Sequence, residues 1–344
     1  MNKETIIITG ATGQLGQFVV KYLQDNNIDI NIVATLRHKS FDNQTYIFDS
    51  SRVTWELMDL SDPISIENLI VKYKPKYFLN TAANAFVGES WSVPVQHIEI
   101  NTLGVLYQLE AIRKHSPLTR YLNLGTSEEF GADVNNGNLQ NESTLIDPKS
   151  PYACSKAAAR YLVNIYRNSY NLYAVQPWCF NFESELRGEK YVTRKITKGV
   201  ARIFHAIQNK ESYKPIELGN LNSYRSWQFA GDVADAIWRM FNQDVFNPNY
   251  TSPKSYVISA DSCHTVRDFI NKALDAAGIN DSCMFDSAIT INQKFVRPHD
   301  VTYLNGDASA IIKDLGWARQ YSFYELVQRM VEYDIKNYKK ELTF

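Results

Sequence analysis

The sequence predicts an α/β fold: a Rossmann-like, doubly wound parallel sheet with a smaller C-terminal region that binds the substrate. In the first half of the 344-residue chain, short β-branched apolar runs alternate with amphipathic helical patterns. This alternation is typical of a parallel sheet covered by helices on both faces. A glycine-rich turn lies between the first apolar run and the first helical pattern, at the position where such sheets bind dinucleotides.

Six apolar runs are expected to form the strands of this sheet. They lie at residues 5–9, 30–36, 53–58, 77–80, 121–124 and 172–177. Helical patterns lie between them at 64–73, 95–115 and 151–170. Beyond about residue 178, helical patterns at 194–208, 231–242, 265–277 and 322–337 are separated by loops rich in Asn, Pro and Gly. We expect residues 1–178 to form the dinucleotide-binding domain and residues 179–344 mainly the substrate-binding region, interleaved with the first.

The composition argues against several classes of function. A formal net charge of −1 gives no reason to expect a nucleic acid or a membrane surface as a partner. No run approaches the eighteen apolar residues of a membrane span, and the N-terminus leads into strand-like sequence without a signal core. The cysteines have neither metal-ligand nor disulfide-framework spacing. We expect a cytoplasmic protein without a bound metal.

The glycine-rich turn predicts a dinucleotide site. It reads Gly10-Ala11-Thr12-Gly13-Gln14-Leu15-Gly16. Glycines allow a positive φ and let backbone N–H groups approach a pyrophosphate at the positive end of a helix. The spacing G-x-x-G-x-x-G is the variant seen in extended short-chain dehydrogenases. A merely tight turn is the alternative, but the position between a strand and a helix favours the dinucleotide.

The end of the second strand favours NADP over NAD. An NAD site usually has a carboxylate there for the ribose 2′-hydroxyl, whereas this chain continues with Arg37 and His38. A basic pair at this position suits a 2′-phosphate, although a solvated charged loop is the alternative. Further cofactor contacts are expected after the third and fourth strands, at Asp59, Leu60, Ala82 and Ala83.

Tyr152 and Lys156 form a Tyr-x-x-x-Lys pattern one helical turn apart. A free tyrosine has a pKa of about 10, and a nearby lysine with a positively charged nicotinamide would lower the pKa of the phenol. Tyr152 would then remove a hydroxyl proton while hydride passes from a sugar carbon to NADP. Lys156 would also hydrogen-bond the nicotinamide ribose.

Thr126 and Glu128 add a second proton transfer to this scheme. Thr126 ends the fifth strand, and Glu128 lies two residues later, on the same side if the strand continues. Once carbon 4 of the sugar is a ketone, a carboxylate can remove the acidic carbon 5 proton as the carbon 6 hydroxyl leaves. The hydride then returns to carbon 6, so the net reaction is loss of water. A surface carboxylate is the alternative role for Glu128 and the expected one for Glu129.

These motifs resemble those of the GDP-mannose 4,6-dehydratases along essentially the whole chain. Residues 180–184 read Phe-Asn-Phe-Glu-Ser, and residues 187–196 read Arg-Gly-Glu-Lys-Tyr-Val-Thr-Arg-Lys-Ile. They are similar to the family signature F-N-H-E-S-x-x-R-G-E-N-F-V-T-R-K-I. Residues 218–227 resemble L-G-N-L-x-x-x-R-D-W, and residues 297–300 resemble R-P-x-E with Asp300 in place of Glu.

The resemblance implies roles for individual residues. Thr126, Glu128 and Tyr152 would be catalytic, with Lys156 in support, and Arg187 would reach the cofactor region. Substrate contacts are implied at Ser127, Asn181, Val192, Lys195, Arg225, Arg297 and Asp300. Arginines suit the phosphates of a GDP-sugar because they give charge-assisted, bidentate hydrogen bonds. The resemblance also implies a homodimer or homotetramer.

Three departures from the family pattern concern the sugar and the cofactor. Phe182 replaces a histidine, Asn84-Ala85-Phe86 replaces Q-S-H, and His38 replaces a second arginine of the basic loop. The first two make the pocket more apolar, so a mannose-like hexose is the first expectation and another GDP-sugar the alternative. Two other functions stay open. A sugar-nucleotide 4-reductase or 4-epimerase needs no carbon 5 base, and a non-catalytic NADP-binding protein would only retain the fold.

Overall fold

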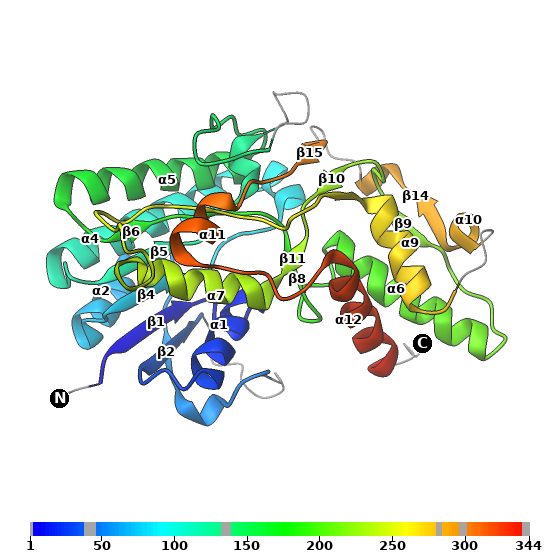
Figure 1. The fold of residues 1–344 in the computed structure, drawn as a ribbon, viewed down its shortest axis with the longest axis horizontal. Helices are drawn as coiled ribbons and strands as arrows, with labels where there is room; N and C mark the ends of the chain where they lie inside the picture. Colours follow the sequence, from blue (N-terminus) through cyan, green and yellow to red (C-terminus); the bar gives the residue numbers. More distant parts are fainter. Residues whose placement is uncertain (1–2, 38–45, 132–138, 280–283, 296–300, 339–344) are drawn as a thin grey trace.

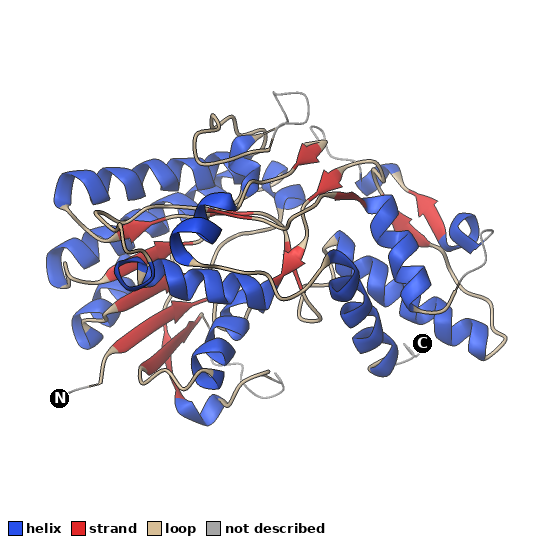
Figure 2. Cartoon of the chain, in the orientation of Figure 1, coloured by secondary structure: helices blue, strands red, loops and turns tan. Residues whose placement is uncertain are grey.

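A computed structural model describes residues 3–37, 46–131, 139–279, 284–295 and 301–338. Its main sheet is fully parallel and contains β1 (Thr5–Thr9), β2 (Asn31–Leu36), β3 (Val53–Leu57), β4 (Tyr77–Asn80), β5 (Arg120–Asn123) and β6 (Ala174–Val175). The strand order is β3-β2-β1-β4-β5-β6, the order of doubly wound dinucleotide-binding sheets. The structure therefore confirms the predicted fold class (Figures 1 and 2).

Helices cover both faces of this sheet. On one face, α2 (Pro63–Tyr73), α4 (Gly104–His115) and α5 (Pro151–Tyr170) bury apolar side chains against the strands. On the other face lie α1 (Gln14–Asp25), α7 (Ala230–Phe241) and α11 (Ser309–Leu315). The cover of the second face is thus drawn from both halves of the chain, and α7 packs along α1 (Figure 1).

The predicted helix over 95–115 is divided into three pieces. It begins as α3 (Pro94–Ile98), widens into a π-helical turn at Glu99–Leu103 and continues as α4. Asn101, within the π turn, hydrogen-bonds the Ser155 hydroxyl of α5 at 3.0 Å. A uniform helical period was the wrong expectation here, because π turns of this kind leave no periodic signal in the sequence.

Helices predicted in the second half form as α6 (Val192–Gln208), α7, α9 (Val266–Ala276) and α12 (Phe323–Lys336), joined by the shorter α8 (Gln243–Phe246) and α10 (Met284–Ala288). Helix α12 packs against α6 and α9 (Figure 1). None of the described helices has the length and apolarity needed to cross a membrane.

Short strands that the sequence analysis missed connect these helices. Parallel pairs join β7 (Trp178–Cys179) to β12 (Val257–Ile258), β8 (Phe182–Glu183) to β11 (Gln228–Phe229), and β9 (Ile216–Leu218) to β14 (Ile289–Ile291). Strand β10 (Tyr224–Arg225) lies between β13 (His264–Thr265) and β15 (Tyr303–Leu304). The pairs that contain β7 and β8 begin near the carboxyl edge of the main sheet, because these two strands closely follow β6 in the chain.

Candidate active site

The glycine-rich turn forms a tight loop between β1 and α1. Gly10 has a φ of +66°, and a Cβ on it would lie 2.8 Å from the Ala82 nitrogen and the Thr81 hydroxyl. A Cβ on Gly16 would overlap the carbonyl of Gly10. Gly13 is the N-cap of α1 and carries no side chain that could occupy the first N–H groups. The loop therefore leaves the helix terminus open to a pyrophosphate.

Gln14 links this turn to the signature segment of the second half. Its amide nitrogen donates to the Phe182 carbonyl at 3.0 Å, and its amide oxygen accepts from the Ser184 hydroxyl at 2.8 Å. The predicted cofactor turn and the predicted substrate segment are therefore in direct contact.

The other predicted cofactor residues lie along the same edge of the sheet. Arg37 follows β2 and is exposed, while His38 lies outside the described residues. Asp59 follows β3 and accepts hydrogen bonds from the backbone and hydroxyl of Ser61 at 2.8 and 2.7 Å. Leu60 is buried in the core, so only its backbone remains for a ligand. Ala82 and Ala83 follow β4 and are half-buried.

Tyr152 and Lys156 lie in the first two turns of α5. The Ser150 hydroxyl caps this helix by accepting from the Ala153 nitrogen at 3.1 Å, which fixes the direction in which the helix begins. Tyr152 and Lys156 are both buried. The Thr126 side chain lies near enough to the Tyr152 phenol to lower its pKa, so the structure brings Thr126 and Tyr152 together.

The electrostatics of this pair differ from the sequence-based expectation. Burial raises the pKa of Tyr152, the nearby Thr126 side chain partly offsets this rise, and the charges of Tyr191, Glu128 and Glu129 raise the pKa further. The Lys156 ammonium donates to the Leu124 carbonyl at 2.9 Å. Burial lowers the pKa of Lys156 to about 8. In this state Lys156 is held at the end of β5 and the phenol is protonated.

The two adjacent glutamates have different environments. Glu128 is half-buried in the 3-10 turn Ser127–Phe130, and its nitrogen donates to the Thr126 hydroxyl at 3.3 Å. Glu129 is 0% exposed, accepts from the Thr126 nitrogen at 2.9 Å and pairs with the buried Arg160. The expectation that Glu129 is a surface carboxylate was wrong, because Arg160 of α5 neutralises it inside the protein. Glu128 is therefore the more exposed of the two carboxylates.

A line of hydrogen-bonded side chains crosses the carboxyl edge of the main sheet. The Thr9 hydroxyl donates to Asn80 at 2.6 Å, the Asn80 amide to Asn123 at 2.8 Å, and the Asn123 amide to Gln176 at 2.7 Å. Gln176 then donates to the Lys156 carbonyl at 3.0 Å. All four donors are buried. This line ties the ends of four strands together beneath the predicted catalytic residues.

Two residues beside Tyr152 were not predicted from the sequence. The ring of His97 lies edge-to-face with the Tyr152 ring, with centroids 6.1 Å apart. Tyr191 precedes α6 and acts electrostatically on the phenol. The signal for Tyr191 was its place in the signature, where the family pattern has Phe. His97 gave only the weak signal of a polar residue in an otherwise apolar helical pattern.

Tyr191 belongs to an aromatic cluster that contains two of the departures from the family pattern. Phe86 packs edge-on against Tyr191 with centroids 5.6 Å apart. The Arg187 guanidinium lies 3.6 Å from the Tyr191 ring centroid and 5.9 Å from that of Phe182. Arg187 also pairs with the buried Glu183 at 3.1 Å. Phe86 and Phe182, distant in sequence, thus lie at the same Arg187–Tyr191 pair, Phe86 against the ring and Phe182 near the guanidinium.

The remaining predicted substrate residues are spread over several elements. Ser127 is buried next to Thr126, and the Asn181 carbonyl accepts from the Gln228 nitrogen at 3.0 Å. The Lys195 ammonium lies 3.4 Å from the centroid of the Phe295 ring, and burial lowers its pKa. The other members are Val192, exposed at the start of α6; Arg225, buried on β10; and Arg297 and Asp300, which lie outside the described residues.

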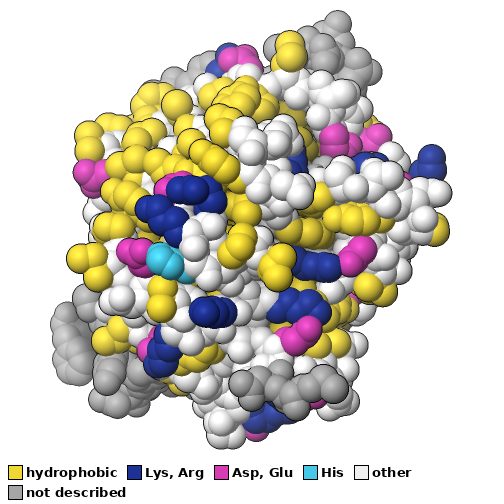
Figure 3. Space-filling view, turned by 90° about the vertical axis from the view of Figure 1, so that its left-hand side faces the viewer, with side chains coloured by type: hydrophobic (Ala, Val, Ile, Leu, Met, Phe, Trp, Pro, Cys, Tyr) yellow, Lys and Arg dark blue, Asp and Glu magenta, His cyan; other side chains and the backbone are white. Residues whose placement is uncertain are grey.

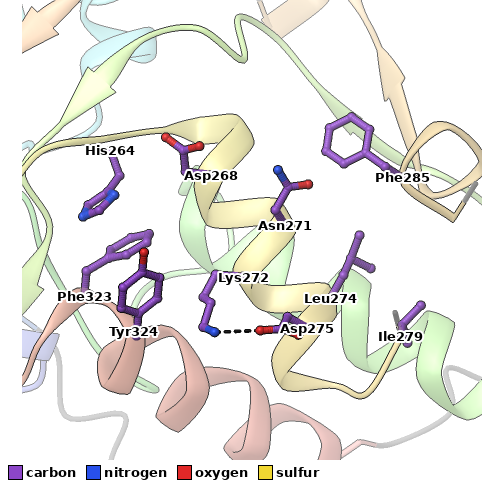
Figure 4. Close-up of a pocket in the computed structure, with 10 residues that line it drawn as sticks. All are labelled: His264, Asp268, Asn271, Lys272, Leu274, Asp275, Ile279, Phe285, Phe323 and Tyr324. Carbon is purple, nitrogen blue, oxygen red and sulfur yellow. Dashed lines mark hydrogen bonds and ion pairs between the residues drawn. The ribbon is translucent and has the colours of Figure 1, made fainter. Parts of the chain in front are cut away.

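A separate hollow of about 820 Å³ lies beside α9 and the start of α12 (Figure 4). The rings of His264 and Phe323 stack there with centroids 3.8 Å apart, and the Lys272 ammonium forms an ion pair with the Asp275 carboxylate at 2.6 Å. The residues that line this hollow include none of the predicted site residues. Within the described ranges, His, Cys, Asp and Glu do not gather into a group of three that could hold a metal ion.

Solved structures with the same fold include several enzymes of sugar nucleotides. The dTDP-glucose 4,6-dehydratase of Bacillus anthracis in complex with NAD has a TM-score of 0.78 at 20% identity, with 97% of each chain covered. The RMD protein of Pseudomonas aeruginosa complexed with NADPH has a TM-score of 0.75 at 18% identity, covering 97% of this chain and 99% of that one. At these identities the likeness shows the fold.

Sequence comparisons identify the family. The model of the family described as GDP-mannose 4,6 dehydratase matches residues 7–330. GDP-mannose 4,6 dehydratase 1 of Arabidopsis thaliana is 34% identical, covering 98% of this chain and 92% of the relative. The GDP-mannose 4,6 dehydratase of Drosophila melanogaster is 33% identical, covering 97% and 87%. These matches confirm the resemblance drawn from the motifs: the chain belongs to the GDP-mannose 4,6-dehydratase family.

Proposed function

We propose that this protein is an NADP-dependent GDP-mannose 4,6-dehydratase that converts GDP-mannose to GDP-4-keto-6-deoxymannose. The observation that carries the proposal is the group at the end of β5, where Thr126 lies near enough to Tyr152 to lower the pKa of the phenol and Glu128 lies half-buried two residues further on. A 4-reductase or 4-epimerase needs the tyrosine but has no use for a second base. The full-length family match supports the same choice.

The chemistry follows from what each side chain can do. Thr126 and Tyr152 bind the carbon 4 oxygen, and the Tyr152 phenolate removes its proton. Glu128 removes the carbon 5 proton, made acidic by the carbon 4 ketone, and assists departure of the carbon 6 hydroxyl. Lys156 holds the nicotinamide ribose. NADP would supply the oxidation at carbon 4 and the reduction at carbon 6; Tyr152 would return the proton it took to carbon 5 as carbon 6 is reduced, so the net change is loss of one water.

The residues present fit the cofactor. A Cβ on Gly10 would clash with Ala82 and Thr81, and one on Gly16 with the Gly10 carbonyl, so the glycines permit the tight turn that presents the start of α1 to a pyrophosphate. Arg37 stands just beyond β2 where NAD sites have a carboxylate, which supports NADP. We include Arg187 in the proposal as a residue that reaches the cofactor region.

We propose GDP-mannose as the first substrate to test, with another GDP-hexose as the alternative. Lys195 and Arg225 supply positive charge for the diphosphate. The aromatic cluster of Phe86, Phe182 and Tyr191 leaves fewer hydrogen bonds for the sugar than the family's two histidines would. This replacement is the specific observation that favours the alternative sugar.

A cytoplasmic homo-oligomer completes the proposal. Tyr161 and Ile165 are more than half exposed on α5, and Val95 is exposed on α3. Apolar side chains on a helix face suit a contact with a second copy of the chain. Figure 3 views the molecule from the left of Figure 1, and hydrophobic side chains gather over its upper part. Cys154, Cys179 and Cys263 are free thiols, as suits a reducing compartment.

The deciding experiment is incubation with GDP-mannose and substoichiometric NADP, followed by mass spectrometry of the products. We expect loss of one water from the substrate with no net change in NADPH. Stoichiometric consumption of NADPH would show a reductase and overturn the proposal. If GDP-mannose is unchanged while another GDP-hexose loses water, the reaction type stands and the sugar is corrected.

A further inference from the structure

His97 is a buried imidazole beside the proposed catalytic phenol. It lies on α3, is 1% exposed, and its ring meets the Tyr152 ring at 88° with centroids 6.1 Å apart. Edge-to-face contacts of this kind restrict the orientation of both rings. A phenylalanine would fill the same space and make the same ring contact.

The polar atoms of His97 lower the stability of the protein in this position. No described residue hydrogen-bonds its buried Nδ1 atom, and an unsatisfied buried polar atom lowers the stability of a protein. Burial is the main cause that lowers the pKa of His97; Lys156 lowers it further, and Glu89 on the preceding 3-10 turn opposes them. Burial therefore favours the neutral imidazole, and phenylalanine would be the more stable choice for packing alone.

We propose that His97 is a positioning residue for Tyr152 whose neutral imidazole completes its hydrogen bonding with a hydroxyl group when the substrate is bound. The hydroxyl belongs either to the sugar or to a water molecule ordered by it. The inference rests on the proposed function, because it takes Tyr152 as the base. The unfavourable Nδ1 atom of the free protein is then retained for its use in the complex.

The test compares three variants. His97→Phe keeps the ring contact and removes both nitrogens, so we expect the Tm of the free protein to rise by roughly 1 to 3 °C and kcat to fall about tenfold or more. His97→Asn places an amide nitrogen near the position of Nδ1, and we expect it to recover part of the lost kcat. His264→Phe is the matched control, because His264 is a half-buried ring that stacks on Phe323 and hydrogen-bonds Ser262. We expect the Tm of this variant to fall or stay unchanged and its kcat to stay unchanged.

The kinetic constants identify the hydroxyl. A higher KM for the GDP-sugar together with the lower kcat indicates a sugar hydroxyl, and a lower kcat alone indicates an ordered water. A His97→Phe variant as active as the wild type would overturn the inference, as would one that loses stability. An inactive wild type, tested with several GDP-hexoses, is the separate sign that the proposed function has failed.

Discussion

Replacing Arg160 by methionine tests how the buried end of the site is held. Arg160 and Glu129 have side chains that are 2% and 0% exposed and pair with each other. Arg160 also donates to the carbonyls of Gln176 and Pro177 at 2.5 and 3.2 Å, and its guanidinium lies 3.5 Å from the centroid of the Trp178 ring. Methionine retains much of this packing but leaves Glu129 as an uncompensated buried charge.

The expected loss of stability follows from that uncompensated charge. Removing one partner of a buried ion pair costs about 3–5 kcal/mol, whereas an exposed pair contributes about 0–1 kcal/mol. Arg113→Met, which removes a partly exposed partner of Glu110 on α4, is the matched control and should cost about 1 kcal/mol or less. The double variant Arg160→Met with Glu129→Gln removes both charges and should recover about 2 kcal/mol relative to Arg160→Met.

Urea unfolding followed by circular dichroism measures these differences in a double-mutant cycle. Because Glu129 also accepts from the Thr126 nitrogen, Arg160→Met should in addition lower kcat. The reasoning is refuted if Arg160→Met costs no more than Arg113→Met, or if the double variant is no more stable than Arg160→Met.

Three further outcomes are expected. Glu128→Gln should lower dehydration by about 10²- to 10⁴-fold while GDP-sugar binding persists, because only the carbon 5 base is lost; turnover equal to that of the wild type would contradict this role. Gly10→Ala should weaken NADP binding in a fluorescence titration and lower the Tm, because its φ of +66° and the nearby Ala82 nitrogen disfavour a Cβ. Lys156→Met should stabilise the free protein by about 3 kcal/mol below pH 8, because the pKa of Lys156 falls from 10.5 to about 8 on burial. Between pH 8 and about 10.5 the unfolded chain binds more protons than the folded chain, so the stability of the wild type rises with pH in this window. Urea unfolding at pH 10 should therefore show a smaller stability gain for Lys156→Met. A gain that is constant with pH would argue against the lowered pKa of Lys156.

The parts of the fold that were predictable have local signals. The strands of the main sheet are apolar β-branched runs, and α5 begins at Ser150 and Pro151, which are a good N-cap and first-turn residue. Strands such as β8 and β11 contain two residues each and exist because residues 182 and 228 meet in space. No alternation can develop over two residues, so tertiary contact alone defines these strands.

The candidate site likewise contains residues that local motifs predict and residues whose environment only tertiary contacts define. Motifs singled out Thr126, Glu128 and Tyr152, and the structure brings Thr126 and Tyr152 into contact. Burial of Glu129 was not predictable, because its neutralising partner lies 31 residues later on α5. The ammonium of Lys156 likewise has its partner in a backbone carbonyl, and a backbone acceptor leaves no trace in residue identities.

The line of side chains along the sheet edge has a fixed direction. Each of its amides accepts on the β1 side and donates on the β6 side, so turning one amide around would place two donors or two acceptors face to face. Gln176 also donates to Glu129 at 3.1 Å, and an ionised carboxylate can only accept. The Lys156 carbonyl, which accepts from the same amide at 3.0 Å, can also only accept, so the two acceptors together set the polarity of the row. Because backbone groups cannot be turned around, Glu129→Gln should leave the sense of the row unchanged: Gln176 would still donate to the Lys156 carbonyl, and Thr9, which accepts from the Ala82 nitrogen at 3.1 Å, would still donate to Asn80 at the opposite end.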